Sequence, residues 1–243
     1  MTRDPIIGEF VGTFFMILLG DGVVAGCILK RTKGEGAGWM AITTGWAFAV
    51  LCGIFIANLF GSSDAFLNPA FTLGFAVKSG AFNKILPYLV AQMAGAFAGA
   101  AVVWLFYLPH WRATEDPALK LGVFCTGPAI RSYGANLICE IIGTFVLVVV
   151  AGAMTSKLVL PTGAATGLTP FLVACLIWSI GLSLGATTGY AINPARDFGP
   201  RLAHALLPIA GKGESDWRYS WIPVVGPFIG ASLAGVLLRM IHA

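Results

Sequence analysis

Two Asn-Pro-Ala triplets place a matched pair of hydrogen-bonding groups in an otherwise apolar sequence of 243 residues. They consist of Asn68, Pro69 and Ala70, and of Asn193, Pro194 and Ala195. Asn is a preferred N-cap residue and Pro is favoured at the first helical position, so each triplet predicts a helix start. Capping occupies the side-chain oxygen and leaves the amide NH2 to donate to a hydroxyl or water oxygen. One triplet would indicate only a capped helix, whereas two at equivalent places indicate caps that meet in a pore.

Backbone carbonyls and an arginine flank these predicted caps. Extended residues precede both caps, and their carbonyl groups lack helical partners; they are Asp64, Ala65 and Phe66, and Gly189, Tyr190 and Ala191. Arg196 follows the second triplet inside an apolar stretch, where an arginine is costly and indicates a functional site. The alternative to a functional role is that Arg196 forms an ion pair with Asp197 or anchors the loop. Facing helix N-termini and a cationic side chain would repel cations and protons, while donors and acceptors together would replace the hydration of a neutral polar solute.

Three acidic side chains lie within predicted apolar helices. Glu9 and Glu140 begin similar sequences, and one alternative for them is a proton relay in a coupled transporter. Asp21 stands between two glycines near the end of the first apolar segment. One reading places Asp21 in the vestibule of the pore; of the two we favour a water-exposed helix end, which would place Asp21 in solvent.

The composition indicates the elements that must position these groups. Hydrophobic residues make up 57% of the chain, and charged residues 11%, against about 25% in soluble proteins. Six segments are long enough to cross a bilayer as helices: 5–29, 38–60, 84–108, 134–156, 168–188 and 219–241. The stretches 68–78 and 193–205 are too short to cross alone and are predicted to be re-entrant half-helices, which membranes tolerate beside a water-filled cavity. A soluble enzyme, a disordered chain and a disulfide scaffold are excluded.

An internal repeat relates the two triplets. Glu9 to Phe14 resembles Glu140 to Phe145, and the pair Gly95-Ala96 recurs as Gly230-Ala231. These matches and the triplets follow the same order, so the chain contains a duplicated unit with three spans in each copy. Because three is odd, the second copy must be inverted in the membrane. We predict one transmembrane domain over 1–243, with repeats at about 5–108 and 134–241.

The remaining bulk properties exclude several classes of ligand. The net charge is +4, but the basic residues are scattered among loops and form no nucleic-acid-binding stripe. The five cysteines form no CxxC pair, so we expect neither a metal site nor a disulfide framework.

If the N-terminus is cytoplasmic, the inner loops carry five Lys or Arg residues and the outer loops eight, so the charge rule favours the opposite orientation.

The paired triplets and the run Gly189 to Arg201 resemble the major intrinsic protein (aquaporin) family, as does the stretch Tyr107 to Trp111. Within it, the sequence is similar to the glycerol uptake facilitators of Gram-positive bacteria, in the aquaglyceroporin branch. The resemblance implies an all-α membrane fold with six transmembrane helices and two half-helices. It further implies a passive channel for glycerol and other small neutral solutes, with some water, that excludes ions and protons. No enzymatic activity and no cofactor are expected. The implied assembly is a homotetramer in the cell membrane with both termini cytoplasmic.

The resemblance also assigns roles to single residues. Its narrow filter corresponds to Trp46, Gly181, Tyr190 and Arg196, where two aromatic faces and a guanidinium would hold a polyol. Gly181 leaves room for a three-carbon polyol where water-specific channels carry a histidine. Glu9 and Glu140 are expected to accept hydrogen bonds from backbone N–H groups and brace the re-entrant loops, and Asp197 is included among the bracing residues. Asp197, Arg201 and Pro223 match the glycerol-conducting branch.

One departure and three rival functions stay open. Phe66 occupies a position where the family commonly has histidine, so its ring either narrows the pore or packs into the wall. A secondary transporter can also be built on inverted repeats. A channel tuned to water, or to a neutral acid such as protonated lactic acid, is a second rival. A membrane enzyme is disfavoured, because His110 and His204 have no metal-ligand spacing.

Overall fold

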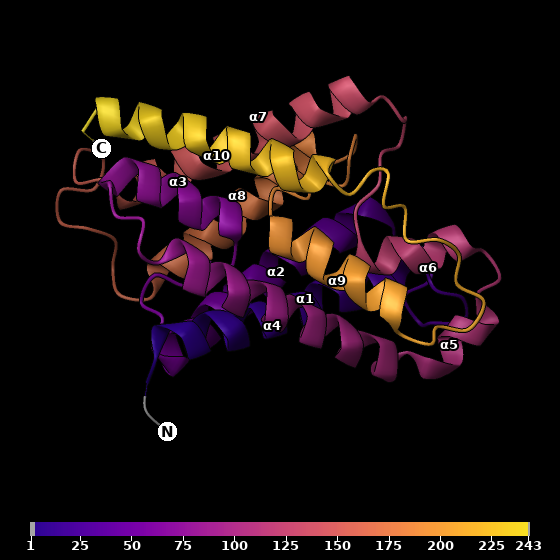
Figure 1. Ribbon diagram of the computed structural model, residues 1–243. Helices are drawn as coiled ribbons and strands as arrows, with labels where there is room; N and C mark the ends of the chain where they lie inside the picture. The colour runs from indigo at the N-terminus through magenta and orange to yellow at the C-terminus, as the bar shows by residue number, and fades with distance from the viewer. Residues whose placement is uncertain (1–2, 243) are drawn as a thin grey trace.

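The computed structural model describes residues 3–242, which contain α-helices and no β-strand. Figure 1 shows the helices side by side, with the start of α1 and the end of α10 on the same side of the bundle. The helices are α1 (Pro5–Ile28), α2 (Gly38–Phe60), α3 (Pro69–Ser79), α4 (Ile85–Phe106), α5 (Leu108–Ala113), α6 (Pro117–Phe124), α7 (Tyr133–Thr155), α8 (Leu168–Leu184), α9 (Pro194–Leu206) and α10 (Ile222–Met240). The short helices α5 and α6 lie in the connection between the predicted repeats and were not predicted from the sequence.

Five of the described helices, α1, α2, α4, α7 and α10, are long and apolar enough to span a membrane. The chain is therefore a membrane protein. The remaining predicted span corresponds to α8, which is apolar but has only 17 residues. Its predicted end at residue 188 is wrong because the chain turns after Leu184 and reaches Gly189 at a φ of +83°, which starts the second re-entrant loop.

The half-helices α3 and α9 have 11 and 13 residues and begin directly after the two asparagines. Asn68 and Asn193 are both extended N-caps, as their types predict. Their Oδ1 atoms accept from the backbone N–H groups of Ala70 and Ala195 at 2.9 and 3.0 Å. In Figure 1 the two half-helices point their N-terminal ends toward each other from opposite sides of the bundle.

Glycines at equivalent places allow the spans of each half to approach closely. A Cβ atom on Gly95 of α4 would overlap the carbonyl oxygen of Phe10 in α1. In the second half, a Cβ on Gly230 of α10 would overlap the carbonyl oxygen of Ile141 in α7. Small residues let membrane helices pack backbone to backbone, so these contacts explain the repeated glycine pattern. Close packing of α1 with α4 and of α7 with α10 fixes the framework around the half-helices.

Candidate functional site

The two asparagine caps bond to each other's loops. Asn68 Nδ2 donates to the carbonyl oxygen of Ile192 at 2.8 Å, and Asn193 Nδ2 donates to that of Leu67 at 2.8 Å. Each amide therefore uses one N–H on the opposite loop and retains the other for a solute. The expectation that the whole NH2 group serves the solute is wrong in this respect, because the cross-links that join the half-helices need half of it.

Glu9 holds the loop before α3. Its carboxylate accepts from the backbone N–H groups of Phe66 and Leu67 at 2.9 and 2.8 Å, and also from Ser62 Oγ and Gln92 Nε2. Glu9 is fully buried, so these donors replace the water that the carboxylate loses. Three of these donors thus connect α1 to the segment that ends at Asn68, and Gln92 connects it to α4.

Glu140 makes the corresponding contacts in the second half. It accepts from the N–H groups of Ala191 and Ile192 at 3.0 and 2.8 Å and from Thr188 Oγ1 at 2.7 Å. Both braced loops carry strained backbone: φ is +43° and +52° at Ala65 and Leu67, and +40° and +43° at Tyr190 and Ile192. Non-glycine residues in this region cost about 1 kcal/mol or more each, so the acids help to keep a conformation that the chain alone would avoid.

The four residues that the resemblance assigns to a filter form two contacting pairs. The guanidinium carbon of Arg196 is 4.1 Å from the centroid of the Trp46 ring, and Nη1 donates to the carbonyl oxygen of Phe124 at 3.2 Å. In the second pair, a Cβ atom on Gly181 would lie 2.9 Å from Cζ of Tyr190. Trp46, Tyr190 and Arg196 line a cavity of about 40 Å³ that also reaches both cap asparagines. Two aromatic rings and a guanidinium thus surround a space of molecular width.

Trp39 supports this arrangement from outside. Its Nε1 donates to the carbonyl oxygen of Gly181 at 3.0 Å, and its ring meets that of Tyr190 edge to face at 5.8 Å between centroids. The bond fixes the end of α8 against α2, which positions the glycine beside the tyrosine.

The ionic partners of this region differ from those expected. Asp21 is fully buried, and its Oδ1 lies 3.6 Å from Arg196 Nη1. The expectation of a water-exposed position is wrong, because this turn of α1 is covered by its neighbours: Gly20 lies directly against the Trp46 ring. The alternative pairing of Arg196 with Asp197 is also wrong.

Asp197 pairs instead with Arg201, at 2.8 Å. It also accepts from the backbone N–H and the hydroxyl of Thr126 at 2.8 and 2.7 Å. Arg201 in turn donates to the carbonyl oxygens of Ser215 and Thr126. These bonds connect α9 to the segments that follow α6 and α9, and so hold the C-terminal end of α6, where Phe124 lies, next to Arg196.

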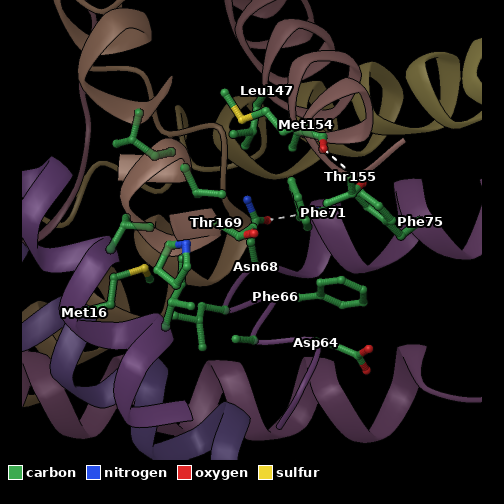
Figure 2. Close-up of a pocket in the computed structure, with 18 of the residues that line it drawn as sticks. Met16, Asp64, Phe66, Asn68, Phe71, Phe75, Leu147, Met154, Thr155 and Thr169 are labelled. Atoms are coloured by element: carbon green, nitrogen blue, oxygen red, sulfur yellow. Dashed lines mark hydrogen bonds between the residues drawn. The ribbon is translucent and has the colours of Figure 1, made fainter. Parts of the chain in front are cut away.

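A larger cavity, of about 330 Å³, lies on the other side of the asparagine pair. Figure 2 shows Met16, Asn68, Leu147 and Met154 on its walls. It shares Met16, Val50, Asn68, Leu147, Ile177 and Asn193 with the small cavity, so the two meet at the caps. Among the described residues, no cluster of three His, Cys, Asp or Glu side chains could hold a metal ion.

Phe66 lies on the wall of the large cavity, where its ring packs in an aromatic cluster (Figure 2). Its centroid is 5.5 Å from those of Phe71 and Phe75 and 6.1 Å from that of Tyr88. The Phe66 ring was expected either to narrow the pore or to pack into its wall, and these contacts agree with packing into the wall. The side chain of Asp64, two residues earlier, is occupied by Lys84 Nζ at 2.6 Å and by the Tyr88 hydroxyl at 2.8 Å.

Sequence reasoning missed several contributors to the site. Asp21 carried a usable signal, since an acid inside an apolar helix indicates a functional place, as it did for Glu9. Gln92 and Thr126 gave no comparable signal, because single polar residues in helices and loops are common. The carbonyl of Phe124 could not be found from its side chain at all.

Known proteins resemble the chain over its whole length. The family described as Major intrinsic protein matches residues 2–238. A protein of Thermotoga maritima named Probable glycerol uptake facilitator protein is 55% identical over 233 residues, which cover 95% of this chain and 96% of that protein. Glycerol uptake facilitator protein 3 of Lactiplantibacillus plantarum is 54% identical, with 99% and 100% covered. The X-ray structure of the aquaglyceroporin from Plasmodium falciparum superimposes with a TM-score of 0.85 at 26% identity and covers 98% of this chain and 96% of that one. The chain belongs to the major intrinsic protein family.

Proposed function

We propose that the chain is a passive channel for glycerol and other small neutral solutes, with some water, that excludes ions and protons. The observation that carries the proposal is the pair of capped half-helices, cross-linked at the centre of two connected cavities with Arg196, Trp46 and Tyr190 at one end. The relatives named as glycerol uptake facilitators support the same conclusion.

The filter would act by matching both faces of a polyol. The rings of Trp46 and Tyr190 offer an apolar surface to its carbon atoms, while the guanidinium of Arg196 donates to its hydroxyl groups. Gly181 contributes by its lack of a side chain, since a Cβ there would already press on Tyr190. Beyond the filter, each cap asparagine has one N–H left for the next hydroxyl.

Ion exclusion would follow from the same elements. Two helix N-termini carry partial positive charge toward the asparagine pair, and the amides there act as donors. A cation or an excess proton would meet donors where it needs acceptors, whereas a neutral solute oxygen accepts from them.

The proton-relay alternative receives no support from the acids. The carboxylates of Glu9 and Glu140 are each held by at least three donors, two of which are backbone N–H groups. A relay needs a carboxyl group that can exchange its proton with a neighbour, whereas these carboxylates are engaged by fixed donors of the loops that they hold. We therefore assign both acids, with Asp197, to supporting the loops.

We also propose that both termini are cytoplasmic and that the protein is a homotetramer of the cell membrane, as the family resemblance implies. Three of the eight basic residues counted on the opposite side of the bundle are engaged by local partners. Lys212 Nζ donates to three carbonyl oxygens around the end of α9, each at 2.7 Å, and Lys120 donates to two others. Arg131 is bonded to Asp216, which raises its pKa. Labelling of a cysteine placed at either terminus in intact cells would test the orientation, and cross-linking in the membrane would test the assembly.

Transport measurements on proteoliposomes test the function directly. Stopped-flow light scattering should show glycerol entry that rises in proportion to its concentration and needs no ion gradient. Flux that saturates at low concentration and depends on a gradient would support a coupled transporter instead. Water flux without glycerol flux would support the water-tuned rival.

A further inference from the structure

Asp21 is a buried acid that neither caps a half-helix nor braces a re-entrant loop. It lies on α1, is 0% exposed, and is one of the few charges within the membrane-spanning helices. Neither of its carboxylate oxygens accepts a hydrogen bond from any residue in the described part of the chain. Glu9 on the same helix has four donors, so the two acids have different functions. An acid without donors is costly to bury and requires a charge nearby.

That charge is the guanidinium of Arg196. Asp21 Oδ1 lies 3.6 Å from Nη1, which is within ion-pair range but too long for a hydrogen bond. Asp197 is the other charge close enough to act on Asp21, and it is already paired with Arg201. Arg196 is held at the same time by the Phe124 carbonyl and by the face of Trp46. The guanidinium therefore lies between Asp21 behind it and the small cavity in front of it.

We propose that Asp21 is the counter-ion that positions Arg196 and makes the filter selective for neutral polyols over small anions. This inference rests on the proposed function. Asp21 attracts the guanidinium toward α1, which keeps it over the Trp46 ring and leaves the cavity wide enough for a polyol. It also balances the arginine's charge, so the filter offers donors to a hydroxyl without acting as a binding site for an anion.

The charge balance matters because an unpaired guanidinium is a strong anion ligand. Its planar fork binds carboxylates and other oxyanions with two parallel hydrogen bonds. In a narrow, poorly hydrated cavity such an anion would bind tightly and block the solute. A carboxylate fixed behind the arginine weakens the attraction between the guanidinium and an anion. The hydrogen bonds that the guanidinium donates to neutral hydroxyl groups are retained.

The test compares Asp21→Asn with Arg196→Gln and the double variant in proteoliposomes. Asp21→Asn keeps the shape and removes the charge. We expect the ratio of glycerol to water permeability to fall about tenfold, because the released guanidinium moves into the cavity and obstructs the larger solute more. We also expect formate and nitrate to inhibit glycerol flux at about tenfold lower concentration than in the unmodified protein. In the Arg196→Gln background, Asp21→Asn should change neither quantity.

Glu35→Gln is the matched control, because it removes one carboxylate from an exposed ion pair with Lys30 in the segment after α1. It should leave both readouts unchanged. If Asp21→Asn lowers water and glycerol flux equally and leaves anion inhibition unaltered, Asp21 has only a packing role and the inference is wrong. The same follows if its effect persists without Arg196.

Two further outcomes are also decisive. If Asp21→Asn does not fold, the double variant should fold, because it no longer buries an uncompensated arginine; failure of both overturns the inference. If the unmodified protein moves water but no glycerol, the proposed function fails. An unchanged Asp21→Asn variant of an active glycerol channel would refute the counter-ion role alone.

Discussion

The width of the filter at Gly181 yields the sharpest prediction. A Cβ atom at this position would lie 2.9 Å from Cζ of Tyr190 and 3.0 Å from Cγ2 of Thr43. The first contact is 0.5 Å short of the 3.4 Å at which ordinary van der Waals contact begins. Even Gly181→Ala must therefore displace the tyrosine ring, which is held from behind by Trp39, and the ring can move only at the expense of the cavity.

Overpacking of this kind costs about 1–3 kcal/mol, and each 1.4 kcal/mol corresponds to about a factor of ten in rate. We expect Gly181→Ala to reduce glycerol permeability about tenfold while water permeability changes much less, because water needs a narrower passage. Gly181→His should abolish glycerol flux and spare water. Stopped-flow light scattering with purified protein at equal density in the vesicles measures both solutes.

Gly22→Ala is the matched control, since this α1 glycine has no atom within 4 Å of its would-be Cβ. Both changes add one methyl group within a helix, so both gain helix propensity, and the contacts with Tyr190 and Thr43 distinguish them. Wild-type glycerol flux in Gly181→Ala, or an equal loss of water and glycerol flux, would show that Gly181 does not set the filter width.

Three further substitutions test the supports of the pore. Glu9→Gln should lower the free energy of unfolding by about 2 kcal/mol, because an amide cannot accept from all four donors, while the exposed Glu115→Gln should have no effect in the same thermal melt. Phe66→His should leave glycerol permeability within about twofold of wild type, since the ring lies in the wall; a large rise would mean that the phenyl ring restricts the pore. Lys212→Met should reduce stability by about 1–2 kcal/mol through the loss of bonds to α9 carbonyls, and an unfolding temperature equal to that of the exposed Lys157→Met would contradict this.

The spans and half-helices could be predicted because they depend on local properties of the sequence. Apolar length indicates a transmembrane helix, and Asn followed by Pro fixes a helix start, so the beginnings of α3 and α9 agree with the prediction. The end of α8 and the presence of α5 and α6 depend on tertiary contacts. Trp39 and Glu140 determine where the chain leaves α8, and neither contact can be derived from that segment.

For the site too, single residues could be predicted from the sequence, but their contacts could not. The sequence indicated the cap asparagines and the two glutamates, because amide and acidic side chains are rare in apolar segments, whereas the residues of the expected filter came from the family resemblance. It did not identify their partners: Asp197 was considered for Arg196, but Asp21 lies beside it. The two aspartates are 176 residues apart in the chain, and a choice between them requires knowing how α1 crosses α9. Pairing across inverted repeats is a three-dimensional property.

The two loops share one backbone conformation but carry different side chains, and this difference makes one end of the pore narrow and the other wide. Both loops have the same backbone: Ala65 and Tyr190 occupy matching positions at φ of +43° and +40°. On this shared geometry the first half carries an alanine facing a cavity of about 330 Å³, and the second carries a tyrosine at one of about 40 Å³. One position after each triplet, Phe71 joins the aromatic cluster while Arg196 enters the filter. The cross-linked asparagines lie where the halves are alike, and the proposed filter lies where they differ. Side-chain changes at the filter can therefore alter selectivity while the central bonds stay in place.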